Sequence, residues 1–481
     1  MSAPRLYDVT PPARDPRELA AAIGKERFAA FAAAAAKASE RFAGRRIINI
    51  NSTPAGGGVA EMLESLVSYA RGLGIDAQWH VIEGDERFFE ITKRIHNHIY
   101  GLPGDDGPLG EAEHADYFAI HKAVAGRLRE IVGPDDVVVI QDPQPAGLVP
   151  LAKELGVPVL WRCHIGVDQS TVHDVEGWEF IRRYVEPADT FLLTRTAYAP
   201  AWMDRGKLRT VRSSIDPMAP KNRPLSPGYV KDLLVHYGLI AGPQPGPLTF
   251  TRKDGTEAPV SRRADVLQAG PPAPADAPLV VQISRWDRMK DMPGVARAFA
   301  DHLLDTDAHL ALVGPAISGY ADDPEGAEQM IEAMWAWREL PGPARERIHL
   351  ACIPMTDLEE NALVINALQR HAAVITQKSV SEGWGLTVVE AMLKGTPVVG
   401  STVGGLREQI VDGESGLLVE ATDLAGFADA LRRLLTDADF ATKIGEAGQQ
   451  RALDLFTADC HLTRYARIIH DTLALREIAD R

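Results

Sequence analysis

The sequence predicts an α/β protein with two doubly wound, Rossmann-like domains that face a central cleft. Short apolar segments, such as 47–51 and 137–141, alternate with stretches of helical periodicity, as parallel strands covered by helices do. The alternation is interrupted after residue 217 and begins again with the apolar segment 279–284. The chain has 481 residues, which is more than one hydrophobic core normally holds, so two domains are expected.

The expected domain boundaries follow the composition of the connecting segments. Residues 1–222 are predicted to form the N-terminal domain and residues 223–460 the C-terminal domain, with a linker rich in Pro, Lys and Asn around 217–227. The last helical segment, 461–481, is expected to pack back on the first domain. Residues 240–278 hold many Pro and Gly residues and a polar, hairpin-like piece, TFTRKDGTEAPVSRR, and we interpret them as an insertion or mobile loop.

The overall composition excludes several functional classes. The formal net charge of −15 argues against general nucleic-acid binding, which relies on a basic surface. No apolar segment reaches the length of a membrane span, so no membrane association is expected. The three cysteines lie far apart and form no metal-ligand pattern, which favours free thiols in a reducing compartment. We therefore expect a cytoplasmic protein.

A glycine-rich loop follows the first strong strand. Strand 47–51 leads into Pro-Ala-Gly-Gly-Gly at 54–58, and a helix follows. The main-chain N–H groups of Gly57 and Gly58 would face an anion at the start of that helix. The loop lacks the G-x-G-x-x-G and G-K-[ST] patterns, so an ordinary tight turn explains it equally well. Glu61, one turn inside the helix, either accepts hydroxyl groups of a ligand or lies on the surface.

Polar residues follow two further strands of the first half. Asp142 and Gln144 come directly after strand 137–141, and His164 comes directly after strand 157–163. In open α/β sheets, ligands bind beyond the carboxyl ends of the strands. Asp142 and Gln144 are therefore candidates for hydroxyl recognition. His164 is a candidate ligand contact, although a single histidine is often a satisfied structural group.

No metal site is predicted from the spacing of ligand-type residues. His96 and His98 are two residues apart on an expected helix, so they would point to different faces. The polar run 93–98 is interpreted as a solvated helix face. The two D-x-D triplets, 305–307 and 437–439, follow predicted helices and not strand ends.

The second half carries a basic pair at the corresponding place. Arg285 and Lys290 lie between strand 279–284 and the next predicted helix. A guanidinium binds phosphate oxygens in bidentate fashion and an ammonium adds a point charge, so this pair fits a diphosphate. Surface ion pairing is the alternative. The strand ending at Ile353 offers main-chain groups to a nucleotide base.

The segment 379–399 contains the most specific pattern. Glu382 and Glu390 frame a loop and helix with seven residues between them, and Gly383 and Gly385 lie directly before the helix. Glycines allow close approach of a ligand, the helix start favours phosphate, and carboxylates accept sugar hydroxyls. A capped surface helix with two solvated glutamates is the alternative.

These residues resemble the E-x7-E element of family 4 retaining glycosyltransferases. The combination of NSTPAGGGVAEML, QDPQPA, WRCHI, SRWDRMK and SEGWGLTVVEAM resembles the trehalose glycosyltransferring synthases, one branch of that family. The resemblance covers nearly the whole chain. It implies the B-type glycosyltransferase fold.

The resemblance also implies an activity. Glucose would pass from a nucleoside-diphosphate glucose, UDP- or ADP-glucose, to glucose, forming α,α-trehalose with retention and without a metal or other cofactor. A homodimer is also implied. The implied catalytic groups are Arg285, Lys290, Glu382 and His164; the donor site comprises Gly57, Gly58, Gly383, Trp384, Gly385, Leu386, Thr387, Glu390 and Ile353; the acceptor site comprises Asp142, Gln144 and Glu61.

Three alternative functions remain at this point. A trehalose phosphorylase would use glucose 1-phosphate and would not need Glu390 for a ribose. A non-catalytic nucleotide-sugar-binding protein would carry the same binding groups. A dinucleotide oxidoreductase is disfavoured, because no G-x-G-x-x-G follows a strand.

Overall fold

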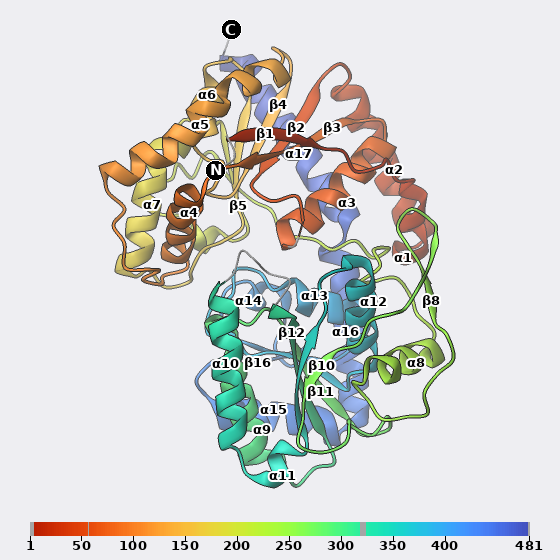
Figure 1. Cartoon of the computed structure of the whole chain (residues 1–481). Coiled ribbons are helices and arrows are strands. Elements are labelled where there is room, and N and C mark those ends of the chain that lie inside the picture. Colours follow the sequence, from red (N-terminus) through yellow and green to blue (C-terminus); the bar gives the residue numbers. More distant parts are fainter. Residues whose placement is uncertain (1–3, 56, 318–323, 480–481) are drawn as a thin grey trace. The chain divides into compact units, whose positions relative to one another are not determined.

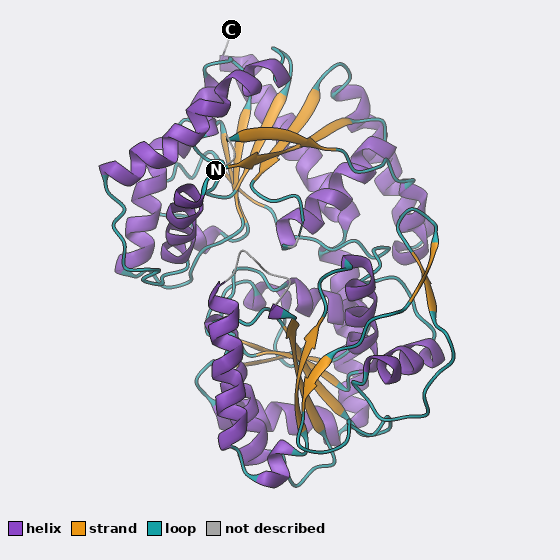
Figure 2. Ribbon diagram, in the orientation of Figure 1, coloured by secondary structure: helices purple, strands orange, loops and turns teal. Residues whose placement is uncertain are grey.

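The computed structural model describes residues 4–55, 57–317 and 324–479 (Figure 1). Gly56 of the glycine-rich loop lies outside the described residues. The chain divides into two compact units, one formed by Met1–Asp216 with Phe456–Arg481 and the other by Pro217–Leu455. Each unit is a mainly parallel sheet flanked by helices, as Figure 2 shows in orange and purple. The predicted α/β class with two parallel-sheet domains is confirmed.

The described residues of the first unit form a seven-stranded sheet in the order β1-β3-β2-β4-β5-β6-β7. Every neighbouring pair is parallel except β1 with β3. The strands are β1 (Arg5–Val9), β2 (Arg46–Asn51), β3 (Asp76–Glu83), β4 (Val137–Gln141), β5 (Val159–Cys163), β6 (Thr190–Leu193) and β7 (Leu208–Thr210).

Helices cover both faces of this sheet, because its central strands are apolar on both sides. Val138 and Ile140 of β4 face one core, with side chains from α4 (Glu86–Ile99), α5 (Glu111–Ile131), α6 (Leu148–Lys153) and α7 (Val172–Val185). Val137 and Val139 face the other core, with Ile468 of α17 (Ala458–Ala479). The remaining helices are η1 (Pro16–Leu19), α1 (Ala20–Ile23), α2 (Lys25–Arg41), α3 (Gly58–Gly72) and η2 (Thr196–Tyr198).

The second unit repeats this architecture in the order β10-β13-β12-β11-β14-β15-β16 among its described residues. All pairs are parallel except β10 with β13. The strands are β10 (Asp265–Leu267), β11 (Leu279–Ile283), β12 (His309–Pro315), β13 (Ile348–Ile353), β14 (Val374–Gln377), β15 (Val398–Ser401) and β16 (Leu417–Val419). The helices are α8 (Pro227–Tyr237), η3 (Arg288–Lys290), α9 (Met292–His302), α10 (Pro324–Glu339), α11 (Gly342–Arg345), α12 (Leu358–His371), α13 (Leu386–Leu393), α14 (Leu406–Gln409), α15 (Leu424–Thr436) and α16 (Ala438–Leu455).

Each sheet has one point where the strand order reverses direction. In the first unit this point lies between β2 and β4, and in the second unit between β11 and β14. Connections from the two strands leave on opposite faces of the sheet there, so a crevice forms beyond their carboxyl ends. This topology decides where the candidate residues are brought together.

The segment 240–278 contains the hairpin expected within it, since β8 (Thr249–Thr251) pairs with β9 (Glu257–Pro259). The expectation of a loop is corrected at Asp265–Leu267, which form β10, an edge strand of the second sheet. Arg262 Nη1 lies 2.5 Å from the buried Glu360 carboxylate, which also accepts main-chain N–H groups of Ser261 and Arg262. These bonds attach the segment to α12.

The N-terminal residues supply the antiparallel edge strand β1. One other expectation changes. The polar run 93–98 is not a solvated face, because Arg94 and His98 are buried. Arg94 donates to both Asp105 carboxylate oxygens, so its charge is compensated inside the unit. In the part of the chain that is described, no helix is long and apolar enough to cross a membrane.

Candidate active site

Lys290 and Glu382 meet at the reversal point of the second sheet. Lys290 ends the loop after β11, and Glu382 lies in the loop after β14; its carboxylate is 2.6 Å from the Lys290 ammonium nitrogen. Both side chains are largely buried, with 13% and 9% of their surfaces exposed. Ser379 Oγ lies 3.3 Å from the same carboxylate. A preorganised charge pair thus occupies the place where doubly wound sheets bind ligands.

Gln282 connects the loop that contains Lys290 with the loop that contains Glu382. Its side-chain nitrogen donates to the Lys290 carbonyl oxygen at 2.7 Å, and its side-chain oxygen accepts the Lys378 N–H at 3.0 Å. Gln282 is fully buried in β11. Asp291, which caps α9 with a positive φ of 45°, pairs with the Lys378 ammonium group. The positions of Lys290 and of the 378–385 loop are therefore coupled.

The turn from Gly383 to Gly385 delivers the chain into α13. Gly385 has φ 86°, a conformation that side-chain-bearing residues rarely adopt, and it caps the helix that begins at Leu386. The first N–H groups of a helix, here those of Leu386 and Thr387, have no intrahelical partners, whereas the Val388 N–H donates to the Gly385 carbonyl at 3.1 Å. Trp384 is buried in this turn. Anionic groups bind favourably at such a helix start.

Glu390 lies one turn further along, on the buried side of α13. Its carboxylate accepts the side-chain amide of Gln369 at 3.0 Å and lies 3.7 Å from the ammonium nitrogen of Lys221. Lys394 donates to the Glu390 main-chain oxygen and to Asn222. Burial lowers the pKa of Lys394 to about 7, although the Glu390 charge opposes this shift. A carboxylate has about four lone-pair sites, so Glu390 retains capacity for ligand hydroxyls.

The two remaining donor-side candidates lie at the carboxyl ends of β11 and β13, two strands that are separated by β12. Arg285, with 43% of its side chain exposed, bonds to Asp287 at 3.1 Å. Ile353 is buried at the end of β13, and its carbonyl oxygen accepts the Ala316 N–H at 2.8 Å. A cavity of about 400 Å³ lies beside the loop that follows β11 and is lined in part by Arg288, Arg297 and Lys378. Lys290 and Glu382 are absent from its lining, so we centre the site on their pair.

In the first unit, Asp142 and His164 are joined at the ends of β4 and β5. The Asp142 carboxylate accepts the main-chain N–H of His164 at 2.8 Å. Asp142 has φ 66°, a strained conformation for a residue with a side chain, and burial raises its pKa to about 6. Gln144 follows in the same loop, where His121 Nε2 contacts its carbonyl oxygen at 2.9 Å.

His164 is held as a neutral imidazole. Its Nε2 lies 3.0 Å from the side-chain oxygen of Gln141, which can only accept, and its Nδ1 lies 3.4 Å from the hydroxyl of Ser213. Burial, followed by the charges of Arg162 and His461, places its pKa well below the ordinary range. His164 therefore does not carry a positive charge at neutral pH, and its longer contact, from Nδ1 to Ser213, is the one that a ligand hydroxyl could replace.

The glycine-rich loop lies at the reversal point of this sheet, beyond β2. Gly57 caps α3 in an extended conformation, and a Cβ added to it would meet no atom within 4 Å. The backbone and its surroundings would thus accept a side chain at position 57. This favours close approach of a ligand as the reason for a glycine there. Gly58 begins α3, and Glu61 is exposed in its first turn. Gly57, Gly58 and Asp142 therefore follow the two strands that flank the reversal.

Sequence reasoning missed the residues that support these groups. Gln282, Gln369 and Ser213 contact the candidates but have no distinctive spacing. Gln282 carried one available signal, since it is the polar residue in the otherwise apolar run LVVQI. A polar side chain in a fully buried strand needs a partner, and here the partners are main-chain groups of two functional loops.

Comparison with known proteins decides the family. Residues 49–200 match the family described as "Trehalose synthase, N-terminal domain", and residues 358–451 match "Glycosyl transferases group 1". A trehalose synthase of Pyrococcus horikoshii is 31% identical over 435 residues, which are 90% of this chain and 91% of that protein. The chain belongs to the trehalose synthase family. The two domain matches and this relative together support a hexosyltransferase of trehalose-related glycosyl transfer.

The chain is also similar, at lower sequence identity, to a trehalose phosphorylase and to a trehalose-phosphate synthase of known structure. A trehalose phosphorylase of Grifola frondosa is 26% identical over 430 residues, which are 84% of this chain but 54% of that protein. A UDP-forming α,α-trehalose-phosphate synthase from Burkholderia xenovorans has a TM-score of 0.66 at 14% identity, covering 89% of this chain and 99% of that one. At this identity the likeness shows the fold, which is the B-type glycosyltransferase fold.

Proposed function

We propose that this trehalose synthase family member transfers glucose from a nucleoside-diphosphate glucose to the anomeric hydroxyl of glucose, forming α,α-trehalose with retention. The Lys290–Glu382 pair beside the start of α13 carries this proposal. It combines a cation for a diphosphate, an acceptor for sugar hydroxyls and free N–H groups within one reversal point. Few ligands other than a nucleotide sugar use all three.

Different residues of the second unit would contact the diphosphate, the glucose and the ribose of the donor. Lys290 and Arg285 would stabilise the negative charge that develops on the leaving diphosphate, and the N–H groups at 385–387 would add to this. Glu382 would accept hydroxyls of the donor glucose. Glu390, held by Gln369 on the buried side of α13, would accept the ribose hydroxyls. The spacing of seven residues between the glutamates separates these roles.

The transfer needs no side-chain nucleophile. The bond between the anomeric carbon and the diphosphate oxygen breaks, and the acceptor hydroxyl oxygen forms its bond on the same face of the sugar. The acceptor proton passes to the leaving diphosphate oxygen, so the products are trehalose and the nucleoside diphosphate. The protein contributes position and electrostatics, and we expect no requirement for a metal ion or other cofactor in this step.

We assign acceptor recognition to the first unit. Asp142, Gln144 and Glu61 would accept glucose hydroxyls, while Gly57 and Gly58 would offer N–H groups to the diphosphate. The neutral His164 would accept a hydroxyl of the transferring glucosyl group at Nδ1, in place of the 3.4 Å contact with Ser213, without adding charge. Its imidazole is already oriented by Gln141 and Ser213. We also expect a homodimer, which light scattering after size-exclusion chromatography will test.

A product assay tests the proposal. Purified protein receives UDP-glucose or ADP-glucose with glucose, and trehalose and nucleoside diphosphate are measured together. Equimolar amounts of both products are expected, and Lys290→Ala and Glu382→Ala should each lower kcat by about 10²–10³-fold. The exposed α16 residues Lys443 and Glu446 provide controls, since Lys443→Ala and Glu446→Ala remove the same side chains outside the site. Donor binding without trehalose would refute the acceptor assignment.

The phosphorylase relatives justify one alternative. The same chain architecture would then use glucose 1-phosphate, which has no ribose. Trehalose formed from glucose 1-phosphate and glucose, with release of inorganic phosphate, would favour this alternative. Glu390→Gln separates the two, because it should weaken use of a nucleotide sugar and leave use of glucose 1-phosphate unchanged.

A further inference from the structure

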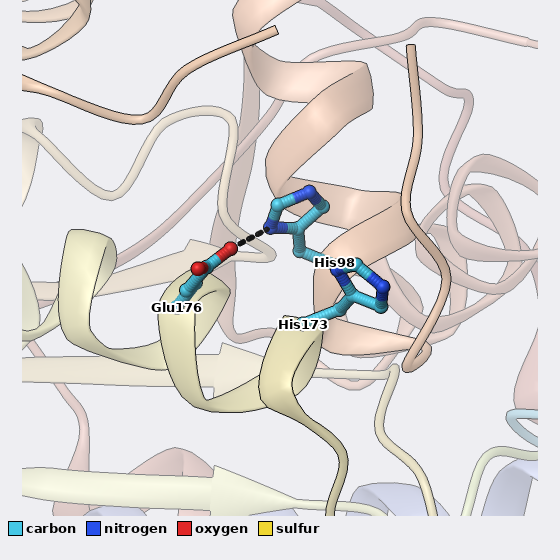
Figure 3. A group of neighbouring side chains, drawn as sticks. All are labelled: His98, His173 and Glu176. Carbon is cyan, nitrogen blue, oxygen red and sulfur yellow. Dashed lines mark ion pairs between the residues drawn. The ribbon is translucent and has the colours of Figure 1, made fainter. Parts of the chain in front are cut away.

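Two histidines and a glutamate converge on the first unit, away from the groups assigned to sugar transfer. His98 comes from the last turn of α4, and His173 and Glu176 come from the start of α7 (Figure 3). One potential ligand atom from each residue lies within 4.8 Å of the others. His98 Nδ1 is 3.6 Å from the Glu176 carboxylate, and the two imidazole rings are 5.2 Å apart.

The local structure holds this cluster in place. Thr171 and Asp174 form a capping box that starts α7, so His173 and Glu176, three residues apart, lie on the same helix face. Gly177 lets α7 approach α4, since a Cβ at Gly177 would lie 2.9 Å from the Cβ of His98. Close packing of the two helices therefore directs His98 towards that face.

The tautomer of His98 suits metal binding. Its Nε2 lies 3.1 Å from the carbonyl oxygen of Pro103, which can only accept, so Nε2 carries the proton in the neutral ring. Nδ1 then has a free lone pair directed at the cluster. His98 is only 4% exposed, and its Nδ1 and that of His173 are buried without a hydrogen-bond partner. Buried polar atoms without partners are rare, and a bound cation would satisfy them.

We propose that His98, His173 and Glu176 bind one divalent transition-metal cation, with Zn²⁺ as the best-suited ion. Two neutral imidazoles and one carboxylate form a donor set that Zn²⁺ accepts, with water in the fourth position. Ligand distances of about 2.0–2.2 Å need ligand atoms closer together than 4.8 Å, which small side-chain rotations supply. The Glu176 side chain, 55% exposed, has room to move.

The cation would act on the structure of the first unit. It would tie the start of α7 to the end of α4, and α7 follows the segment that begins with His164. None of its three ligands belongs to the proposed active site. Zinc binding should therefore raise the thermal stability of the protein, because an ion that binds the folded chain alone stabilises it.

Cobalt titration of the full-length, tag-free protein tests this site. The protein is first stripped with a chelator, and Co²⁺ is added while visible absorption and thermal unfolding are followed; Zn²⁺ then competes. One Co²⁺ per chain with a four-coordinate spectrum, displaced by Zn²⁺, is expected. Mg²⁺ and Ca²⁺ should produce no comparable stabilisation, since they prefer all-oxygen sites.

Variants assign the ligands. His173→Ala and Glu176→Gln should each weaken Co²⁺ binding by about tenfold or more and abolish the thermal shift. Glu179→Gln is the matched control, since Glu179 lies three residues further along α7 with a similar exposure of 52%. His98→Ala also removes the bond to Pro103, so the two α7 variants are decisive. Unchanged binding in both, or no stoichiometric Co²⁺ binding by the unaltered chain, would overturn the proposal.

Discussion

Gln282→Leu is the substitution that tests how the active site is assembled. It keeps the size of the side chain but removes the bonds to the Lys290 carbonyl and the Lys378 N–H. Two buried main-chain groups then lose their partners, at about 1–3 kcal/mol each, so we expect a loss of about 2–6 kcal/mol in the free energy of unfolding. The transition of a unit of this size should shift down by roughly 4–24 °C.

The same change should affect catalysis more than binding. Lys290 is positioned by the loop that Gln282 holds, and a displacement of about 1 Å at a catalytic group lowers the rate about 10²-fold. We therefore expect kcat for trehalose formation to fall by about that factor, with a smaller change in KM for the nucleotide sugar. Steady-state kinetics and thermal unfolding measure both effects on one preparation.

The control is Gln450→Leu, which removes an exposed amide whose bond is to Asp454 one turn away. It should change neither stability nor kcat. If Gln282→Leu matched the unaltered enzyme within twofold in kcat and within a few degrees in Tm, the coupling of the two loops through Gln282 would be refuted.

Three further predictions concern the same unit. Glu390→Gln should raise KM for the nucleotide sugar at least about tenfold, since hydrogen bonds to a charged group contribute about 1.5–3 kcal/mol, and isothermal titration with the nucleoside diphosphate checks the loss. Lys394 has a pKa of about 7 in the folded chain, below the value of 10.5 for an exposed lysine. Between these pH values the unfolded chain binds more protons than the folded chain, so the free energy of unfolding should rise with pH. Urea unfolding at several pH values should show this rise in the unaltered chain and not in Lys394→Met. Gly405→Ala would place a Cβ 2.5 Å from the Trp384 Cα, so it should lower Tm and weaken donor binding, whereas Gly228→Ala, with no atom within 4 Å, should do neither.

Much of the fold was predictable from the sequence because the central strands are buried on both faces. Runs such as 137–140 and 279–281 are continuously apolar, and this signal does not depend on their neighbours. The edge strands β1 and β10 were not predicted. Their short sequences, RLYDV and DVL, are mixed in polarity, and the antiparallel partner that makes each a strand lies at least 70 residues away.

The candidate site divides in the same way. Glu382, Glu390, Arg285 and Lys290 stand in local patterns next to strand ends, so their chemistry could be inferred from spacing. The contacts of Gln282 with Lys378, 96 residues apart, arise only when the strands pair. The same holds for His98 and His173, which come together through helix packing, and for which the spacing of His96 and His98 gave no indication.

The path of the chain has a consequence for dissecting the protein. The second unit, Pro217–Leu455, is an insertion between the main part of the first unit and α17. The Ile215 N–H donates to the Phe456 carbonyl at 2.8 Å, so the two points of insertion are neighbours. The second unit could thus be removed, and a short linker could join Asp216 to Phe456 within the first unit. The first unit, truncated after Asp216, would lack α17 and expose the apolar sheet face that Ile468 covers; it could be made only with that helix fused back.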